Sequence, residues 1–431
     1  MGENNHPVVI LGYGAAAVSA LFGLREGGYT GPITVVNKAA GAPYSPVLTS
    51  YYAAGIVPKD RCFPWSAREL AQLDFALVEN ANVVALNAQA RSVQLADGRT
   101  LLFSKCLIAT GARPITPGFP ETTRYAPLVL RTMDDAERLK AVLADCATRE
   151  VLVSGTSMVA LKALEACLCR GKRVTLLGRS DQILRGSTHP MVAHRCEKLL
   201  EGFGVELRLN DAVARADDAC GAGIDIEFAS DGATRHYDHV ICAQGVAPNI
   251  GFVRPEEIAM NRGIVVDRMM RTSHPDVYAA GDVAEALNLS TGKLKVIGLW
   301  ANAVAQGRVA GRAMAASLCE AAGSLGGSGS PASELPRKAC KPFKGSVPCN
   351  TIHVASMLFA SAGSVAEHEG VRIETEDRDG VFKLTAYRCG DSGARDLIGF
   401  NLLANVGGAV REDSLINETG ILYRELVGHF L

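Results

Sequence analysis

The string GYGAAA at residues 12–17 has residue types and spacing that can bind a phosphate group. It follows a short apolar run at residues 8–11 and begins a helical pattern, which is the context expected of a G-x-G-x-x-G/A dinucleotide fingerprint. Gly12 permits the tight turn, Gly14 lets the backbone approach a pyrophosphate, and Ala17 allows close helix–strand packing. The helix N-terminus then offers free N–H groups to the phosphates. These residues predict a dinucleotide site, and the alternative is a glycine turn with no ligand.

A second, weaker fingerprint follows the apolar run at residues 151–153. It keeps Gly155 but has Ser157 and Ala160 at the other two positions, so the Cβ of Ser157 crowds the pyrophosphate position. Arg179 follows the next predicted strand, where a carboxylate would hold an NADH ribose. An arginine without a neighbouring acid favours NADPH over NADH, and the equal alternative is a solvated surface arginine.

Strand and helix signals alternate around both fingerprints. The first is followed by a helix through Leu24 and a strand at residues 33–36, and the second by a helix to Cys169 and a strand at 173–177. Two such units about 140 residues apart predict two doubly wound, mostly parallel domains.

The C-terminal part of the chain has a different pattern. Residues 321–336 are rich in Gly, Ser and Pro, which predicts a linker or exposed loop. Beyond it, residues 381–387 and 396–403 are predicted to be neighbouring strands, and residues 416–426 a closing helix. This pattern indicates a third, α+β domain.

Composition excludes several function classes. Of 431 residues, 44 are Lys or Arg and 45 are Asp or Glu, so the net charge of -1 argues against a general nucleic-acid or membrane-surface binder. The N-terminal residues lack the pattern of a signal peptide, and no apolar stretch is long enough to span a membrane. Twelve cysteines without a C-x-x-C pair indicate reduced thiols in the cytoplasm rather than a disulfide scaffold or zinc site, and we predict no metal site.

A specific resemblance lies further along the chain. Residues 272–282, TSHPDVYAAGD, resemble the second FAD motif of the pyridine nucleotide–disulfide oxidoreductase superfamily, in which the final Asp, here Asp282, accepts a hydrogen bond from the flavin ribityl chain. Residues 110–114 and 245–249 resemble the two crossings between its FAD and NAD domains. Residues 299–307 resemble the helix whose N-terminus faces the flavin pyrimidine, where the helix dipole stabilises negative charge.

The resemblance covers nearly the whole chain and favours the ferredoxin and rubredoxin reductase and NADH oxidase-like branch. It implies a glutathione reductase-like α/β fold with two Rossmann-like domains and a C-terminal α+β interface domain. The expected boundaries are 1–115 with 246–320 for FAD, 116–245 for NAD(P), and 335–431 for the interface domain. That last domain implies a homodimer or a contact with a partner subunit, for which the apolar runs at residues 350–360 and 397–403 are the expected surface; the alternative is that these runs only cover the domain's own core.

The resemblance also assigns the two nucleotide sites to particular residues. Those expected at FAD are Gly12, Gly14, Ala15, Ala16, Ala17, Asn37, Lys38, Ser45, Thr110, Gly111, Arg113, Gly281, Asp282, Trp300 and Ala301. Those expected at NAD(P) are Gly155, Ser157, Ala160, Arg179 and Gly245. Asn37 stands where an acid is usual and is the weaker partner for a ribose hydroxyl.

The chain departs from the superfamily beside the flavin. Ala40 stands where one branch carries its redox-active cysteine, so no thiolate is available there, and Cys62, the nearest cysteine downstream, is expected to be a packing residue. Tyr51 stands where relatives have a lysine, and Lys162 where many have a glutamate. Tyr44, Tyr51, Lys162 and Trp300 are therefore the flavin-side candidates. For the two tyrosines, packing in the core is an equal alternative.

These observations favour an FAD-dependent NAD(P)H oxidoreductase that passes hydride from nicotinamide to flavin, without a redox-active cysteine. The expected acceptors are a ferredoxin-like iron–sulfur protein, dioxygen or a small organic molecule. The alternative is an FAD-binding electron-transfer or assembly subunit of a multi-component redox enzyme, with no working nicotinamide site. A thiol-active disulfide reductase is disfavoured by Ala40.

Overall fold

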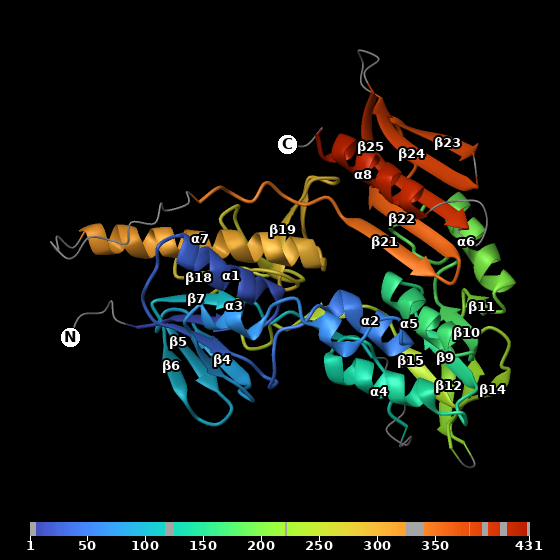
Figure 1. The fold of residues 1–431 in the computed structure, drawn as a ribbon, viewed down its shortest axis with the longest axis horizontal. Helices are drawn as coiled ribbons and strands as arrows, with labels where there is room; N and C mark the ends of the chain where they lie inside the picture. The colour runs from blue at the N-terminus through green and yellow to red at the C-terminus, as the bar shows by residue number, and fades with distance from the viewer. Residues whose placement is uncertain are drawn as a thin grey trace. The chain divides into compact units, whose positions relative to one another are not determined.

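A computed structural model describes residues 6–116, 125–219, 222–324, 340–378, 380–389, 395–405 and 412–428 (Figure 1). The chain divides into two compact units. Unit 1 combines residues 1–45, 60–113 and 247–346, and unit 2 combines residues 46–59, 114–246 and 347–431.

The core of unit 1 is a parallel sheet covered by two helices. Its strand order is β18-β7-β1-β2-β3, and the strands are β1 (Val8–Leu11), β2 (Ile33–Val36), β3 (Ala76–Val78), β7 (Lys105–Ile108) and β18 (Val277–Ala279). Helix α1 (Ala15–Glu26) packs along α7 (Trp300–Ser324) (Figure 1). A Cβ on Gly307 would lie 2.1 Å from the Ala16 carbonyl oxygen, so glycine is what lets these helices cross so closely.

Smaller elements complete unit 1. They are helix α3 (Ala67–Ala71), the antiparallel strands β4 (Val83–Asn87), β5 (Ser92–Leu95) and β6 (Thr100–Leu102), and the sheet of β17 (Ile264–Val265), β19 (Ala284–Asn288) and β20 (Lys293–Val296). Three short elements lie where the chain passes from one unit to the other: η1 (Lys59–Cys62), β8 (Ala112–Pro114) and β16 (Val246–Pro248).

Unit 2 repeats the doubly wound pattern. Its parallel sheet has the order β11-β10-β9-β15, with β9 (Glu150–Ser154), β10 (Arg173–Gly178), β11 (Glu206–Leu209) and β15 (His239–Cys242). The helices are α2 (Pro46–Ala54), α4 (Met133–Ala144), α5 (Met158–Cys169) and α6 (Pro190–Gly202). An antiparallel sheet of β12 (Val213–Asp218), β13 (Ile224–Phe228) and β14 (Thr234–Tyr237) adds a second hydrophobic layer.

The C-terminal part of unit 2 is an antiparallel sheet with one helix. The strand order is β21-β22-β25-β24-β23, formed by β21 (Cys349–Val354), β22 (Met357–Gly363), β23 (Val371–Arg378), β24 (Val381–Cys389) and β25 (Arg395–Asn405). Helix α8 (Glu412–Gly428) packs on β25 and β22 (Figure 1). Residues 397–404 of β25 are all buried, and successive residues of a strand point to opposite faces, so both faces of this strand are covered within the chain.

The predicted α/β fold class is confirmed, and β1, β2 and the end of α5 match the expected bounds. The predicted linker is wrong at its start, because α7 continues to Ser324, and the rest of it, residues 325–339, lies outside the described residues. The apolar run in β25 also does not indicate a dimer surface, since α8 and the neighbouring strands bury it. Large apolar side chains that stay exposed in this part are Ile416 and Ile421 of α8.

Candidate functional site

The two fingerprints fold in the same way. Gly12 and Gly155 both have positive φ, +101° and +130°. A Cβ on Gly12 would lie 2.3 Å from the carbonyl oxygen of Ala109, and one on Gly155 would lie 2.2 Å from that of Ala243. Only glycine fits either turn, because a side chain would meet the backbone of the adjacent strand end. The sequence therefore builds two turns of the same geometry, one in each unit, and this geometry is the one expected of a dinucleotide fingerprint.

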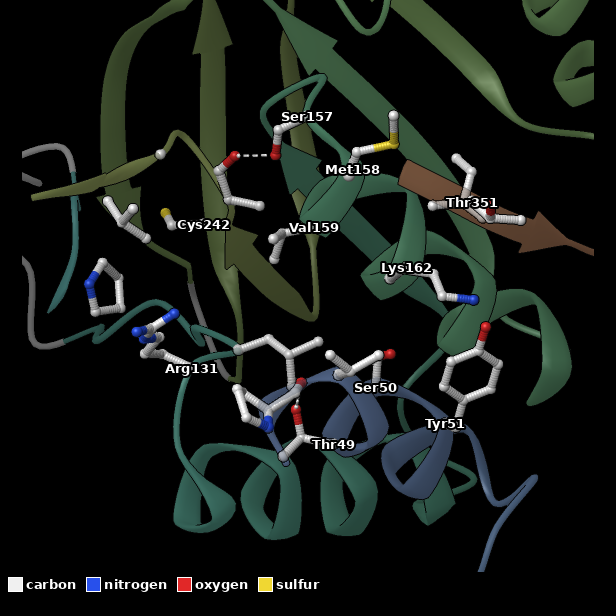
Figure 2. A pocket seen from close by; sticks show the side chains of 18 residues that line it. Thr49, Ser50, Tyr51, Arg131, Ser157, Met158, Val159, Lys162, Cys242 and Thr351 are labelled. Atoms are coloured by element: carbon white, nitrogen blue, oxygen red, sulfur yellow. Dashed lines mark hydrogen bonds between the residues drawn. The ribbon is translucent and has the colours of Figure 1, made fainter. Parts of the chain in front are cut away.

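The turns differ at the N-cap of the helix that follows. Gly14 caps α1 without a side-chain hydrogen bond, and a Cβ placed on Gly14 would meet no atom within 4 Å. Ser157 caps α5 with its hydroxyl, which accepts from the Ala160 amide at 3.3 Å. The same hydroxyl donates to the Ala243 carbonyl at 3.1 Å (Figure 2). The first turn of α1 contains no acidic residue. The α1 N-terminus thus keeps its amides available for an anion, whereas the α5 N-terminus already uses one.

Two further FAD candidates, Gly281 and Trp300, belong to unit 1, as does the nearby helix residue Asn302. Gly281 follows β18, and its amide donates to the Gln306 side chain at 2.8 Å. Asn302, in the first turn of α7, is 5% exposed and its Oδ1 has no hydrogen-bond partner. Trp300 begins α7, and its ring lies 5.4 Å from that of Trp65. The open Gly14 turn and the orphaned buried Asn302 oxygen fit a bound dinucleotide.

The crossing motif is held by hydrogen bonds that end on main-chain carbonyl groups. The Thr110 hydroxyl donates to the Asn249 carbonyl at 2.7 Å, and the Asn249 side chain returns a bond to the Thr110 carbonyl at 3.0 Å. The Gly111 carbonyl accepts from the Asn249 amide at 2.9 Å. The guanidinium of Arg113, which is exposed, donates to the Pro248 carbonyl at 3.4 Å. The two strings that resemble the domain crossings are therefore bonded to each other.

A carboxylate that sequence analysis missed lies beside Asn37. Glu79 follows β3, the parallel neighbour of β2, and accepts from the Gly41 amide at 2.7 Å. The Asn37 side chain donates to the Ala39 carbonyl at 2.8 Å, so part of its bonding capacity is spent inside its own turn. Burial, and secondarily the charge of Glu79, raise the pKa of Tyr13. An acid directly after a short apolar strand was the available sequence signal.

The burial of the remaining FAD candidates differs from residue to residue. Ala15, Ala16 and Ala17 are buried in the first turn of α1, Ser45 is buried with its amide donating to the Cys62 carbonyl at 2.7 Å, and Lys38 and Ala301 are exposed. Tyr44 packs edge-on against Phe63 in unit 1, while Tyr51 belongs to α2 of unit 2.

Unit 2 contains a pocket of about 230 Å³ at the carboxyl ends of β9 and β15 (Figure 2). Apolar residues dominate its lining, and its polar residues include Ser50, Tyr51, Arg131, Ser157 and Lys162. Gly245 also lines the pocket. The structure therefore brings together three residues that the sequence singled out in this unit: Ser157, Lys162 and Gly245. Cys242 lines the pocket too, but burial raises the pKa of its thiol to about 12, so it is not a thiolate at neutral pH.

Arg179 is exposed directly after β10, and its guanidinium has no hydrogen-bond or ion-pair partner among the described residues. The strand order places this position next to the β9 edge that carries Gly155. Ala40 is exposed in the turn after β2, and Cys62 is fully buried. The described residues therefore offer no accessible thiol at the expected redox position.

Two doubly wound units, each with a glycine fingerprint at the carboxyl end of its sheet, define the class of oxidoreductases that bind two dinucleotides. The family described as pyridine nucleotide-disulphide oxidoreductase matches residues 6–307. The chain belongs to this family, and it is an FAD-dependent NAD(P)H oxidoreductase.

Two relatives and one solved structure extend the comparison. The subunit epsilon of NADH-dependent phenylglyoxylate dehydrogenase from Aromatoleum evansii is 31% identical over 368 residues, which are 85% of this chain and 81% of that relative. The ferredoxin–NAD(+) reductase component of the p-cumate 2,3-dioxygenase system from Pseudomonas putida is 30% identical over 306 residues, 70% of this chain and 73% of the relative. The water-forming NADH oxidase from Lactobacillus brevis bound to NADH has a similar fold, with a TM-score of 0.81 at 20% identity, covering 97% of this chain and 91% of that chain.

Among the described residues, no helix is both long and apolar enough to cross a membrane.

Proposed function

We propose that this oxidoreductase takes two electrons from NAD(P)H and delivers them to a ferredoxin-like iron–sulfur protein. The observation that supports this proposal is the pair of glycine turns, one in each unit. The α1 N-terminus is unobstructed at Gly14, whereas the Ser157 side chain occupies part of the α5 N-terminus. Ala40 stands at the position where a redox-active cysteine would act. When bound, FAD would supply the chemistry that links a two-electron hydride donor to a one-electron acceptor. One NAD(P)H then reduces two iron–sulfur clusters and releases one proton. Supporting this acceptor, one relative is named as a ferredoxin–NAD(+) reductase component.

We assign FAD to residues 1–115 and 246–320, NAD(P) to residues 116–245, and partner or dimer contacts to residues 335–431. The chain's own residues hold and orient the nucleotides: the α1 N-terminus with Gly12 and Gly14 faces the FAD phosphates, and Asp282 and the start of α7 face the flavin end. Asn37 and Lys38 are assigned to the adenosine half. In unit 2, Gly155, Ser157 and Ala160 face the NAD(P) pyrophosphate, and Gly245 borders the pocket. We also propose a cytoplasmic location, which is supported by the absence of disulfides among the described cysteines.

The choice of nicotinamide nucleotide rests on Arg179. Its exposed guanidinium has no ion-pair partner among the described residues, and a free arginine at this position favours the 2′-phosphate of NADPH. Both relatives carry NADH or NAD(+) in their names, so the two nucleotides must be compared directly.

A second candidate function is that of an FAD-binding subunit within a larger redox enzyme. Two observations favour it: the Ser157 hydroxyl occupies the α5 N-terminus, and one relative is itself named as a dehydrogenase subunit. Such a subunit would not need to bind a nicotinamide nucleotide.

The test of the acceptor measures cytochrome c reduction by the purified holoprotein with NADPH or NADH, with and without an added plant-type or bacterial [2Fe–2S] ferredoxin. The proposal expects a rate that depends on the ferredoxin and saturates with its concentration. A rate that is unchanged by ferredoxin, with oxygen consumed instead, would assign dioxygen as the acceptor.

A further inference from the structure

A cluster built around the buried ion pair of Lys162 and Glu165 borders the unit 2 pocket and is not used by the function proposed above. It joins three segments that are far apart in the sequence: α2 through Tyr51, α5 through Lys162 and Glu165, and β21 through His353. All four residues belong to unit 2, and Figure 2 shows Lys162 and Tyr51 together at one side of the pocket.

The ammonium group of Lys162 makes three contacts. Its Nζ lies 2.5 Å from Glu165 Oε2, donates to the His353 carbonyl oxygen at 3.0 Å, and lies 3.8 Å from the centre of the Tyr51 ring. An ammonium group has three N–H donors, so these partners use its bonding capacity. Lys162 is therefore a cross-link and does not present a free cation to the pocket.

Loss of the Lys162 ammonium group would leave the Glu165 carboxylate buried without its ion-pair partner. Its side chain is 3% exposed and that of Lys162 is 12% exposed. The second carboxylate oxygen of Glu165 lies 3.4 Å from Nδ1 of His353, so both oxygens face β21 or Lys162. Removing one partner of a buried ion pair leaves an uncompensated charge, whereas replacing both by apolar groups is often neutral.

Strand β21 is the edge strand of the C-terminal sheet, and it contributes to the pocket wall. Its neighbour in the sheet is β22 alone, so its other edge has main-chain groups that need partners. Lys162 supplies one of them at His353, and the preceding residues Thr351 and Ile352 line the pocket.

We propose that Lys162 is a positioning residue that holds β21 against α5 and α2, so that the C-terminal domain forms one wall of the nicotinamide-nucleotide pocket. This inference rests on the proposed function only in naming what the pocket receives. It assigns the C-terminal domain a role in nucleotide binding in addition to any contact with partners.

The first test is Lys162→Met in the holoprotein, compared with Lys162→Arg. The methionine variant should raise the KM for the preferred nucleotide roughly tenfold, equivalent to about 1.4 kcal/mol, with kcat changed less than about twofold. An arginine can donate to the Glu165 carboxylate and to the His353 carbonyl and can stack on the Tyr51 ring. The KM of Lys162→Arg should therefore stay closer to the wild-type value than that of Lys162→Met. Lys162→Met/Glu165→Met removes the unpaired charge of Glu165 but does not restore the bond to the His353 carbonyl, so the KM should remain raised.

The ring contact has its own pair of variants. Tyr51→Leu removes the cation–π contact and should raise KM roughly threefold, whereas Tyr51→Phe keeps the aromatic face and should raise KM less than Tyr51→Leu does. Lys172→Met is a matched control, because Lys172 also donates to two carbonyl oxygens, of Asp145 and Thr148, yet does not line the pocket. It should leave KM unchanged.

Hydrogen exchange tests the same inference without activity. Amides of residues 349–354 should exchange faster in Lys162→Met than in the wild type, while those of β9 and β10 should not. An unchanged KM with unchanged β21 exchange would overturn the proposal, as would a large fall in kcat at constant KM, which would place Lys162 in the redox step. If neither nucleotide reduces the wild-type flavin, the proposed function fails, and the exchange measurement still decides whether Lys162 holds β21.

Discussion

The Ser157 hydroxyl donates to the Ala243 carbonyl oxygen at 3.1 Å and accepts from the Ala160 amide at 3.3 Å, closing the phosphate turn of unit 2 on itself. Gly14, its counterpart in unit 1, has no side chain to make either bond. Under the proposed assignment, the FAD pyrophosphate meets a helix N-terminus with free amides, whereas the NAD(P) pyrophosphate must compete with the Ser157 hydroxyl.

That competition can be relieved by a single substitution. Ser157→Gly removes the Cβ and the hydroxyl, and loss of the cap costs only a few tenths of a kcal/mol when glycine replaces serine. We expect the KM for the nicotinamide nucleotide to fall roughly three- to tenfold, about 0.7–1.4 kcal/mol. Ser157→Ala removes the hydroxyl but retains the Cβ, so it should show only part of this gain. Equal KM values for Ser157→Gly and the wild type would show that the serine does not hinder binding.

The first turn makes a different prediction for each of its glycines. Gly14→Val should fold normally, because φ at Gly14 is -98° and no atom lies near its Cβ position, but its side chain would occupy the pyrophosphate space. The purified variant should be mostly colourless apoprotein with the far-UV spectrum of the wild type. Gly12→Ala should instead be destabilised, because its Cβ would meet the Ala109 carbonyl. Fully yellow Gly14→Val would contradict the placement of FAD.

Asp282 offers a milder change at the flavin end. Asp282→Ala should weaken FAD binding by about 1.5–3 kcal/mol, through loss of a charge-assisted hydrogen bond, without preventing folding. Fluorescence titration of the apoprotein with FAD measures this loss. Affinity equal to that of the wild type would remove Asp282 from the site.

Nucleotide preference should respond to Arg179. Arg179→Glu replaces a phosphate partner with a carboxylate that accepts from a ribose and repels a phosphate, so the ratio of kcat/KM for NADPH over NADH should fall at least roughly tenfold. Arg185→Glu, at an exposed arginine of the same unit, is a charge-matched control. An unchanged ratio would mean that Arg179 is a solvated surface residue.

Helix α8 is the surface to test for assembly. Ile416 and Ile421 are 51% and 56% exposed, whereas the apolar residues of β25 are buried. We expect light scattering to give twice the 45.5 kDa chain mass at micromolar concentration, and Ile421→Asp to shift the protein toward the monomer. A wild-type mass of one chain would count against a homodimer and favour a partner subunit.

The features of the fold that the sequence predicted are those determined by residues close together in the chain. Gly12 and Gly155 each stand between an apolar run and a helical pattern, and the structure confirms a turn with positive φ at both. The C-terminal strands and helix were also visible as local patterns. The linker was placed too early because Ala321–Ser324 are compatible with a helix end as well as with a loop, and α7 simply continues.

Relationships between distant residues were not predictable. Lys162 and His353 are 191 positions apart, and nothing local to either residue indicates that a strand edge meets a helix there. Leu397–Leu403 looked like a surface run because burial by α8 depends on the completed sheet. Glu79 was missed since its relevance comes from the pairing of β3 beside β2, which places it next to Asn37.

The most direct test of the central claim is anaerobic stopped-flow mixing of the purified yellow protein with NADPH and, separately, with NADH. The account predicts rapid loss of flavin absorbance at about 450 nm with at least one nucleotide. The reason is that unit 2 retains the Gly155 turn and has a pocket beside it. Flavin that stays oxidised with both nucleotides, yet is bleached by dithionite, would contradict the account and identify the chain as an FAD-binding subunit without a working nicotinamide site.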